Sequence, residues 1–325
     1  MTRRVGPRHA PMLRWTPVQG GGPIHRTGRA IAAAILAFGL PGCSIRKLAI
    51  NSLGNALAEG GSTYASDEDP ELVRGAVPFG LKTIEALLAE APRHKGLLFA
   101  AASGFTQYAF AFVQQDADFV ENQDLARATA LRARARKLYL RARDYGLRGL
   151  EVDMPGFRDR VRQSRDETLA RAGKRHVPLL YWTGLSWFAA ISLAKNDSEL
   201  SADQGLAESL MKRALELDEG FERGVLHDFY IAWEGRGESV GGSFQRAREH
   251  LDRARALARG HRASPFVTYA ESISVARQDR KEFETLLQQA LEVDPDAEPP
   301  LRLSNLVYQQ RARWLLGRTD DLFVE

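Results

Sequence analysis

Apolar residues recur at helical spacing along most of this 325-residue chain, and no convincing segment alternates with the period of two that marks a β-strand. Asp69-Pro70-Glu71 is typical of a helix start, with Asp at the N-cap and Pro in the first turn. Pro78 is expected to kink or break the helix that follows. The sequence therefore predicts an all-α fold, with further helices through 97–112 and near 124–150, 157–172, 178–195, 203–217, 223–233, 243–259, 264–277, 281–292 and 299–316.

Several of the expected helices end in a similar phrase. ALELD at 214–218 matches ALEVD at 290–294, GLEVD at 149–153 begins with glycine instead, and ARAL at 254–257 is a weaker copy. Two of the three offsets, 40 and 36 residues, are close to the 34-residue tetratricopeptide period, while the third is 65. We therefore predict stacked helix pairs in a tetratricopeptide-like repeat array, although any amphipathic helix can end this way by chance.

Cys43 is the only cysteine, and it follows an apolar run of 11 residues, Ala30–Leu40, that two arginines precede. This order is that of a secretory signal: a basic region, a short apolar region and small residues at the cleavage point. The ending Leu40-Pro41-Gly42-Cys43 resembles a bacterial lipobox, in which cleavage precedes the cysteine and the cysteine is acylated. The run is well short of the roughly 20 residues that span a bilayer. We predict a signal peptide with a long leader over 1–42 and lipidation of Cys43.

Removing the leader changes the charge of the chain. Six of the 45 basic residues and none of the 41 acidic residues lie in 1–42. The mature chain from Cys43 therefore has 39 basic and 41 acidic residues, a net charge of −2. Since a basic surface is the electrostatic signature of nucleic-acid binding, the composition gives no support for a nucleic-acid partner.

No catalytic constellation emerges from the sequence. The histidines show no HExxH or paired metal spacing, no serine lies in GxSxG, and the Gly-rich stretch 235–243 lacks the lysine of a P-loop. Ser243 is better explained as a helix N-cap, and His227-Asp228 as a helix pair, with a metal or base role as the lesser alternative. The arginine-rich helix near 124–150 is expected to face solvent rather than an acidic partner or anionic lipid. The sequence predicts no enzyme activity and no cofactor.

Two groups of aromatic residues lie on two of the expected helices. Their spacing includes i, i+3, i+4 and i+7, so core packing is the default interpretation. The alternative is an apolar channel or ligand cavity between helices, because pockets between packed helices are common ligand sites. The residues that would line such a channel are Phe105, Tyr108, Phe112, Tyr181, Trp182 and Trp187.

Several segments, taken together and in order, resemble the T component of tetratricopeptide-associated TRAP transporters. The likeness runs from Cys43 to about residue 317, and the segments that carry it are DPELVR at 69–74, PFGLK at 78–82, AASGFTQYA at 101–109, YWTG at 181–184 and MKRALELD at 211–218. The resemblance implies a periplasmic lipoprotein that accompanies a TRAP importer and pairs with its substrate-binding P component. It also implies a ring-like homotrimer with pores through the subunits, suited to passing an apolar or organic-acid ligand.

This resemblance completes the expected domain organisation. Residues 43–66 form the lipidated N-terminus and tether, 67–317 the helical tetratricopeptide-like domain, and 318–325 a C-terminal tail. A second hypothesis stays open, namely a tetratricopeptide adaptor for cell-envelope assembly that grips peptide segments in a concave groove. An occluded apolar channel would favour the transport hypothesis, and an open polar groove the adaptor.

The residue after the anchor predicts the location of the protein. Ser44 follows Cys43 where an aspartate would signal retention in the inner membrane, so sorting in Gram-negative bacteria favours the periplasmic face of the outer membrane. Subcellular fractionation tests this expectation. The protein should fractionate with outer-membrane markers, and fractionation with inner-membrane markers would contradict the prediction.

Overall fold

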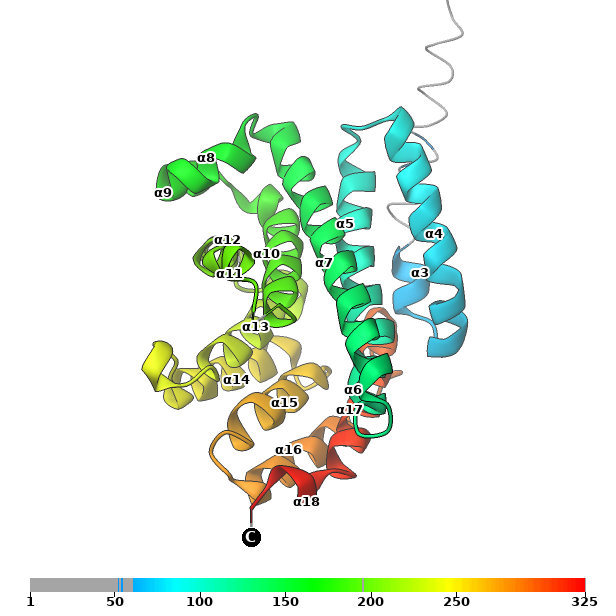
Figure 1. Cartoon of the computed structure of the whole chain (residues 1–325), viewed down its shortest axis with the longest axis vertical. Helices are drawn as coiled ribbons and strands as arrows, with labels where there is room; N and C mark the ends of the chain where they lie inside the picture. The colour runs from blue at the N-terminus through cyan, green and yellow to red at the C-terminus, as the bar shows by residue number, and fades with distance from the viewer. Residues whose placement is uncertain (1–51, 53, 55–60, 195, 325) are drawn as a thin grey trace, which may run out of the picture. The chain divides into compact units, whose positions relative to one another are not determined.

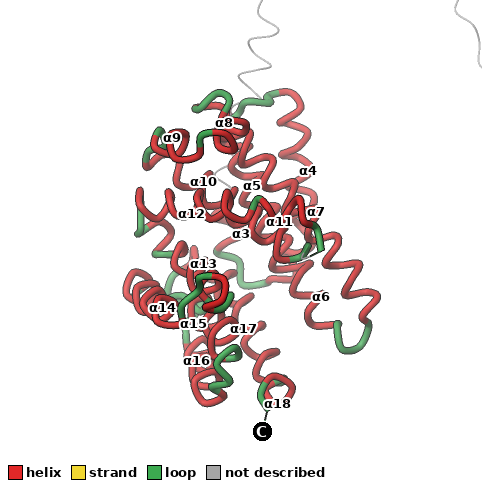
Figure 2. Tube along the Cα trace, turned by 60° about the vertical axis from the view of Figure 1, so that its left-hand side comes forward, coloured by secondary structure: helices red, strands yellow, loops and turns green. Residues whose placement is uncertain are grey.

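The computed structural model describes residues 52, 54, 61–194 and 196–324, and every element in this part of the chain is helical (Figure 2). The all-α prediction is therefore confirmed. Cys43, the leader and most of the expected tether lie outside the described residues, so the lipidation of Cys43 stays a prediction.

Helices begin where the sequence supplies a capping side chain. Asp69 accepts hydrogen bonds of 3.0 Å from the backbone N–H groups of Glu71 and Leu72 and so starts α4 (Pro70–Glu90). Asp124 caps α7 (Leu125–Asp153) in the same way, at 2.8 Å. Ser243 caps α14 (Phe244–Ala258), as predicted. A carboxylate or hydroxyl at this position satisfies backbone donors that have no partner inside the helix.

The predicted break at Pro78 is absent, because α4 continues through it as one helix. A proline inside a helix removes one backbone hydrogen bond. The residues that follow, Leu81, Ile84 and Leu88, are buried against the rest of the protein. Burial of this face compensates for the lost bond, since most helical stability in proteins comes from packing an amphipathic face.

The N-terminal helices pack as successive neighbours. Helix α4 contacts α5 (Lys95–Ala109), α5 contacts α7, α7 contacts α10 (Val177–Ser192), and α10 contacts α12 (Gln204–Leu217), as Figure 1 shows. Helix α5 runs on through the π-helical segment η1 (Phe110–Gln114) into α6 (Gln115–Val120). This stretch, Lys95–Val120, is long and apolar enough to cross a membrane, but 61% of its apolar window is buried inside the protein. It therefore has the character of a core helix.

Some expected helices are divided. The one expected over 157–172 is two, α8 (Phe157–Gln163) and α9 (Arg165–Ala170), because Ser164 between them leaves helical geometry. The one expected over 264–277 is α15 (Ser264–Tyr269) followed by the π-helical segment η5 (Ala270–Ser274). The remaining elements are α3 (Gly61–Ala65), η2 (Lys174–His176), α11 (Ser198–Ala202), η3 (Phe221–Arg223), α13 (Val225–Glu234), η4 (Glu238–Val240), α16 (Arg280–Glu292), η6 (Pro299–Leu301), α17 (Arg302–Leu316) and α18 (Thr319–Leu322).

The repeated phrases lie at helix ends, as predicted. Helices α7, α12, α14 and α16 each end within or just after one of them. The small residue of each phrase is buried at a helix contact: Gly149, Ala214, Ala254 and Ala290. Helices α13 and α14, and α16 and α17, pack as neighbours along the chain. A regular tetratricopeptide period stays a prediction.

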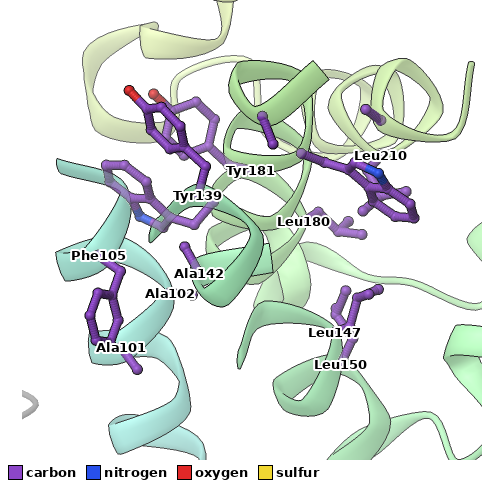
Figure 3. Packing of buried hydrophobic residues seen from close by; sticks show 14 of the residues in the cluster. Ala101, Ala102, Phe105, Tyr139, Ala142, Leu147, Leu150, Leu180, Tyr181 and Leu210 are labelled. Carbon is purple, nitrogen blue, oxygen red and sulfur yellow. The ribbon is translucent and has the colours of Figure 1, made fainter. Parts of the chain in front are cut away.

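The buried hydrophobic residues form two clusters that meet inside α13. One extends from Val73 to Tyr230, and the other from Ile231 to Phe323. Figure 3 shows part of the first cluster, where side chains of α5, α7 and α10 interdigitate. Helix α17 returns to contact α3 and α4, and Arg302 donates a hydrogen bond of 2.9 Å to the carbonyl of Ser66. Because Phe323 is buried, packed structure extends beyond the expected boundary at residue 317.

Glycines allow the close approach of the central helices. A Cβ on Gly146 of α7 would lie 3.0 Å from Cβ and 3.3 Å from Cα of Thr183, on α10. A Cβ on Gly184 would lie 2.8 Å from the sulfur of Met211, on α12. Gly104 of α5 leaves similar room for Leu81 of α4, as the small residues at 100–104 predict. The helices are in contact because these positions carry no side chain.

Replacement of Gly146 by alanine tests this packing. We expect Gly146→Ala to lower the free energy of unfolding by about 2 kcal/mol, because the overpacking outweighs the gain in helix propensity. Gly75→Ala on the exposed face of α4 is the matched control, since nothing lies within 4 Å of the added Cβ. It should raise the free energy of unfolding by about 0.5–1 kcal/mol. Urea unfolding followed by circular dichroism measures both, and equal stabilities of the two variants would contradict the packing argument.

Candidate functional site

A buried network of ions joins the two hydrophobic clusters. Arg311 of α17 is only 8% exposed, and its guanidinium lies 2.5 and 2.8 Å from the carboxylate oxygens of Glu271 and 3.1 Å from Asp118. Asp118 also accepts a hydrogen bond of 3.0 Å from Arg132. Burial by itself lowers the pKa of Arg311, but the two carboxylates outweigh burial and raise that pKa. The guanidinium therefore stays charged and fastens α17 to α6 and η5.

Both π-helical segments lie at this network. Glu271 belongs to η5, and Asp118 lies one turn after η1. Gln114, the last residue of η1, accepts a hydrogen bond of 2.7 Å from the hydroxyl of Tyr139. A π-helical turn changes the direction of the side chains that follow it, and such turns are frequent at functional sites. Their presence supports a candidate site here.

Three tyrosines, each on a different helix, lie near the charged side chains of these ion pairs. Tyr139 of α7, Tyr181 of α10 and Tyr308 of α17 all have raised pKa values, first because they are buried and then because negative charges lie nearby. Their phenols therefore remain protonated and able to donate hydrogen bonds. In Figure 3 the hydroxyl groups of Tyr139 and Tyr181 point in the same direction, away from Ala101. Tyr308 also contacts Phe110 of η1, with ring centroids 5.5 Å apart.

A second buried ion pair, between Arg262 and Asp228, acts electrostatically on Tyr181 and Tyr308. Arg262, in the loop before α15, bonds to Asp228 of α13, and Ser264 donates a 2.7 Å hydrogen bond to the same carboxylate oxygen. The other oxygen, Oδ1, is buried and has no hydrogen-bond partner in the described part of the chain. Burial raises the pKa of Asp228, while Arg262 and Ser264 oppose this rise. Asp228 is also the nearby acid that acts most on the pKa of Tyr308.

A strained turn carries another carboxylate into this region. Glu222, Arg223 and Gly224 have φ of 41°, 57° and 82°, all left-handed, which is costly for the first two residues. Glu222 is exposed, and Arg262 is the charged group that acts on its carboxylate. The preceding residue, Phe221, packs its ring against Tyr181 at 5.5 Å. We call this region the polar junction and define it as Asp118, Tyr139, Tyr181, Glu222, Asp228, Arg262, Glu271, Tyr308 and Arg311.

The six aromatic residues that the sequence singles out are all buried. The structure divides them into groups: Tyr108 packs on Phe112, and Tyr181 on Trp182, at 5.7 and 4.8 Å between ring centroids. Phe105 stacks on Tyr145 of α7, and Trp187 lies beneath Arg143 and Arg162. All six contribute to the first hydrophobic cluster, and Tyr181 also reaches the polar junction. A role for the six in lining a ligand channel stays a prediction.

The other polar features of the sequence are distributed over the surface and core. Arginines of α7 lie over aromatic rings, including Arg134 over Tyr108 and Arg141 over Phe105. His227 bonds to His250 of α14 through their Nδ1 atoms, 2.8 Å apart, while its neighbour Asp228 bonds to Arg262. Among the described residues, no three His, Cys, Asp or Glu side chains gather as metal ligands would.

Sequence reasoning did not identify most of the polar junction. Glu271 is the one acid in FVTYAESISV, and Asp118 shares the segment FVQQDADFV with Asp116, so neither is marked in sequence as a partner of Arg311. Arg262 and Arg311 are indistinguishable in sequence from the many surface arginines. Their partners lie 34 and 193 residues away, so no local pattern connects them.

Replacement of Arg311 tests whether the network holds the two clusters together. Arg311→Gln should lower the free energy of unfolding by about 2–3 kcal/mol, because it removes a buried guanidinium that bonds to Glu271 and Asp118, although Asp118 keeps its hydrogen bond to Arg132. Arg280→Gln is the matched control, since Arg280 also bridges two acids, Glu284 and Asp320, but at the surface. It should cost less than about 1 kcal/mol. Chemical unfolding of both variants measures the difference, and similar costs would argue against a central role for Arg311.

The chain is similar in sequence to known proteins over most of its length. A family model described as TRAP transporter T-component matches residues 66–323, which includes the whole polar junction. An uncharacterized protein of Treponema pallidum (strain Nichols) is 32% identical to this chain over 306 residues, covering 87% of this chain and 94% of that protein. The chain therefore belongs to the TRAP transporter T-component family.

Proposed function

We propose that this protein is a periplasmic lipoprotein accessory of a TRAP-type transporter that docks the substrate-binding P component and passes ligand to or from it. Membership of the T-component family over residues 66–323 is the observation that carries the accessory role. The lipobox-like sequence before Cys43 supports a membrane anchor, most consistent with the outer membrane. The family resemblance supports a homo-oligomer, specifically a trimer.

The polar junction supports the ligand-passing part of the proposal. Hydrophobic clusters alone offer a ligand no orienting groups, whereas binding sites combine apolar walls with a few placed polar side chains. Here Phe110 and Phe221 pack on two of the tyrosines, and the charged side chains lie beside them. Tyr181 links this region to the predicted channel lining. We therefore propose that the transported ligand binds at the polar junction.

An apolar patch on α3 and α4 supports the docking part. Leu72 and Phe79 lie two turns apart on one face of α4, and they are 62% and 80% exposed. Tyr64 of α3 is also exposed, and its hydroxyl would lie 3.2 Å from a Cβ on Gly80, next to Phe79. Exposed apolar groups that cluster in this way mark interaction surfaces. We assign this patch to the P component.

Capture of the native partner tests the function. The full-length protein is affinity-purified from cross-linked native membranes, and the bound proteins are identified by mass spectrometry. We expect a periplasmic solute-binding protein in the eluate and an oligomeric bait. In the double variant Leu72→Ser/Phe79→Ser, the solute-binding protein should be lost, because the apolar contact area is removed.

Leu125→Ser is the control variant, because Leu125 is 64% exposed at the start of α7, away from the patch in sequence. It should retain the partner. Recovery of envelope-assembly proteins without a solute-binding protein would contradict the transport function and favour the adaptor hypothesis. Loss of oligomerisation in the double variant, with the partner retained, would reassign the patch to contacts between copies of this chain.

A further inference from the structure

The contact of Gly54 shows which end of the molecule lies nearest Cys43 along the chain. Gly54 is buried at the start of α5, where a Cβ on it would lie 3.0 Å from Nε2 of His94 and 3.1 Å from Cδ1 of Leu97. Gly54 is 11 residues after Cys43, so even a fully extended chain separates the two by at most about 40 Å. An acylated Cys43 therefore keeps the start of α5 within that distance of the membrane.

The end of α7 lies at the same end of the molecule (Figure 1, top). Arg93, between α4 and α5, donates a hydrogen bond of 3.4 Å to the carbonyl of Val152 in α7. In the other direction, Arg148 of α7 donates one of 3.2 Å to the carbonyl of Pro92. Both guanidiniums bond to backbone carbonyls, so these contacts neutralise neither charge.

Asp153, the last residue of α7, joins a third segment to this end. It pairs with Lys95 of α5, and its Oδ2 lies 4.0 Å from Nε of Arg175 and 3.6 Å from Nε2 of His176, both in η2. Burial and the charge of Arg175 lower the pKa of His176, so that ring adds little charge. One carboxylate therefore serves two cations here. We call the segments 90–95, 148–160 and 171–176 the basic end.

The basic end differs in charge from the rest of the protein. Its three segments contain eight basic and four acidic residues, a net charge of +4, whereas the mature chain from Cys43 has a net charge of −2. Asp218, which lies 3.2 Å from Lys174, leaves this balance positive. The side chains of Lys174 and Arg175 are 74% and 75% exposed, so their charges are accessible from outside. The basic residues are Arg93, Lys95, Arg148, Arg158, Arg160, Arg171, Lys174 and Arg175, and the acidic ones are Glu90, Glu151, Asp153 and Asp159.

We propose that the basic end docks on the anionic phospholipid headgroups of the membrane that holds the anchor. Each Lys or Arg close to an anionic bilayer surface strengthens association about fivefold. An acyl anchor combined with a basic patch holds a protein to a bilayer more stably than one acyl chain does. This inference rests on the lipoprotein part of the proposed function and deepens it, because it gives the anchored protein an orientation.

This orientation leaves the apolar patch of α4 free for a partner. Helix α4 ends at the basic end with Glu90, and Leu72 lies 18 residues earlier in the same helix. At 1.5 Å per residue this separation is about 27 Å along the helix axis. The proposed docking surface for the P component is therefore held away from the lipid surface.

Energy transfer from a fluorescent label to the lipid surface tests the orientation. Cys43 is the only cysteine and its acylation removes the free thiol, so an introduced cysteine can be labelled alone. Ala89→Cys places the label in the last turn of α4, at the basic end, and Ala126→Cys places it in the first turn of α7. Ala126 is about 40 Å along α7 from Asp153. Both positions are exposed.

The lipoprotein expressed from the full-length sequence is reconstituted into vesicles that carry an acceptor dye on their headgroups. The vesicles contain phosphatidylcholine alone or an equal mixture of phosphatidylcholine and phosphatidylglycerol. In the anionic vesicles we expect more energy transfer from the label at Ala89→Cys than from the label at Ala126→Cys. This excess should fall in the neutral vesicles, and also in 1 M salt, where the Debye length is about 3 Å.

The triple variant Arg171→Gln/Lys174→Gln/Arg175→Gln removes three exposed cations of the basic end. It should abolish the excess transfer, because the loss of three cations weakens association with an anionic surface by roughly a hundredfold. Arg127→Gln/Lys281→Gln/Arg313→Gln is the matched control. It removes the same charge at exposed positions outside the basic end and should leave the transfer unchanged. Circular dichroism verifies that both triple variants are folded.

Several results would overturn the inference. Equal transfer from the two labels in anionic vesicles would do so, as would unchanged transfer in the basic-end triple variant. If that variant instead lost the solute-binding protein in the capture experiment, with unchanged transfer, the basic end would be assigned to the P component.

Flotation of the parent protein separates this inference from the anchor. The parent should float with neutral vesicles through its acyl chains, and failure to do so would reject the lipoprotein part of the proposed function. The basic end would then be judged by flotation with the anionic vesicles. Flotation of the parent but not of the basic-end triple variant would support it, and flotation of neither or of both would reject it.

Discussion

The contact of Arg311 with Glu271 and Asp118 links parts of the chain that are far apart in sequence. Asp118 lies on α6 beside the first hydrophobic cluster, and Arg311 and Glu271 lie with the second. Arg311 is buried, and removing its charge from water costs several kcal/mol, so the guanidinium is stable there only beside its carboxylate partners. Tyr308 precedes Arg311 by one helical turn, so the same contact that docks α17 also positions this phenol.

Close packing of the central helices fixes the other side of the polar junction. Gly146 and Gly184 allow α7, α10 and α12 to approach, and this approach orients Tyr139 and Tyr181. Tyr139 is then held by Gln114. Side chains on packed helices are held more rigidly than side chains on loops, so these two phenols keep fixed positions. Glu222 comes from a strained turn, and Arg262 from the loop before α15.

The local features of the fold were predictable because they depend on neighbouring residues. The cap at Asp69, the cap at Ser243 and the helix ends near Gly149 and Ala290 follow from side chains within a few positions. The break that was one of the two expectations at Pro78 did not form, because packing of α4 outweighed a local preference. The division at Ser164, where the backbone leaves helical geometry, was missed because the apolar pattern looks continuous across it.

The sequence by itself determined the helical class, the capped helix starts at Asp69 and Ser243, and the resemblance to the family that the comparisons then established, while the signal and the lipidation of Cys43 stay predictions. Tertiary structure alone decided which buried polar side chains meet. Of the aromatic residues chosen from sequence, Tyr181 belongs to the polar junction, and other members, such as Arg262 and Tyr308, carry no local mark in the sequence. The physical reason is the separation along the sequence over which each interaction acts. Capping and periodicity act within about one helical turn, whereas the partners of Arg262 and Arg311 become neighbours only when the helices pack.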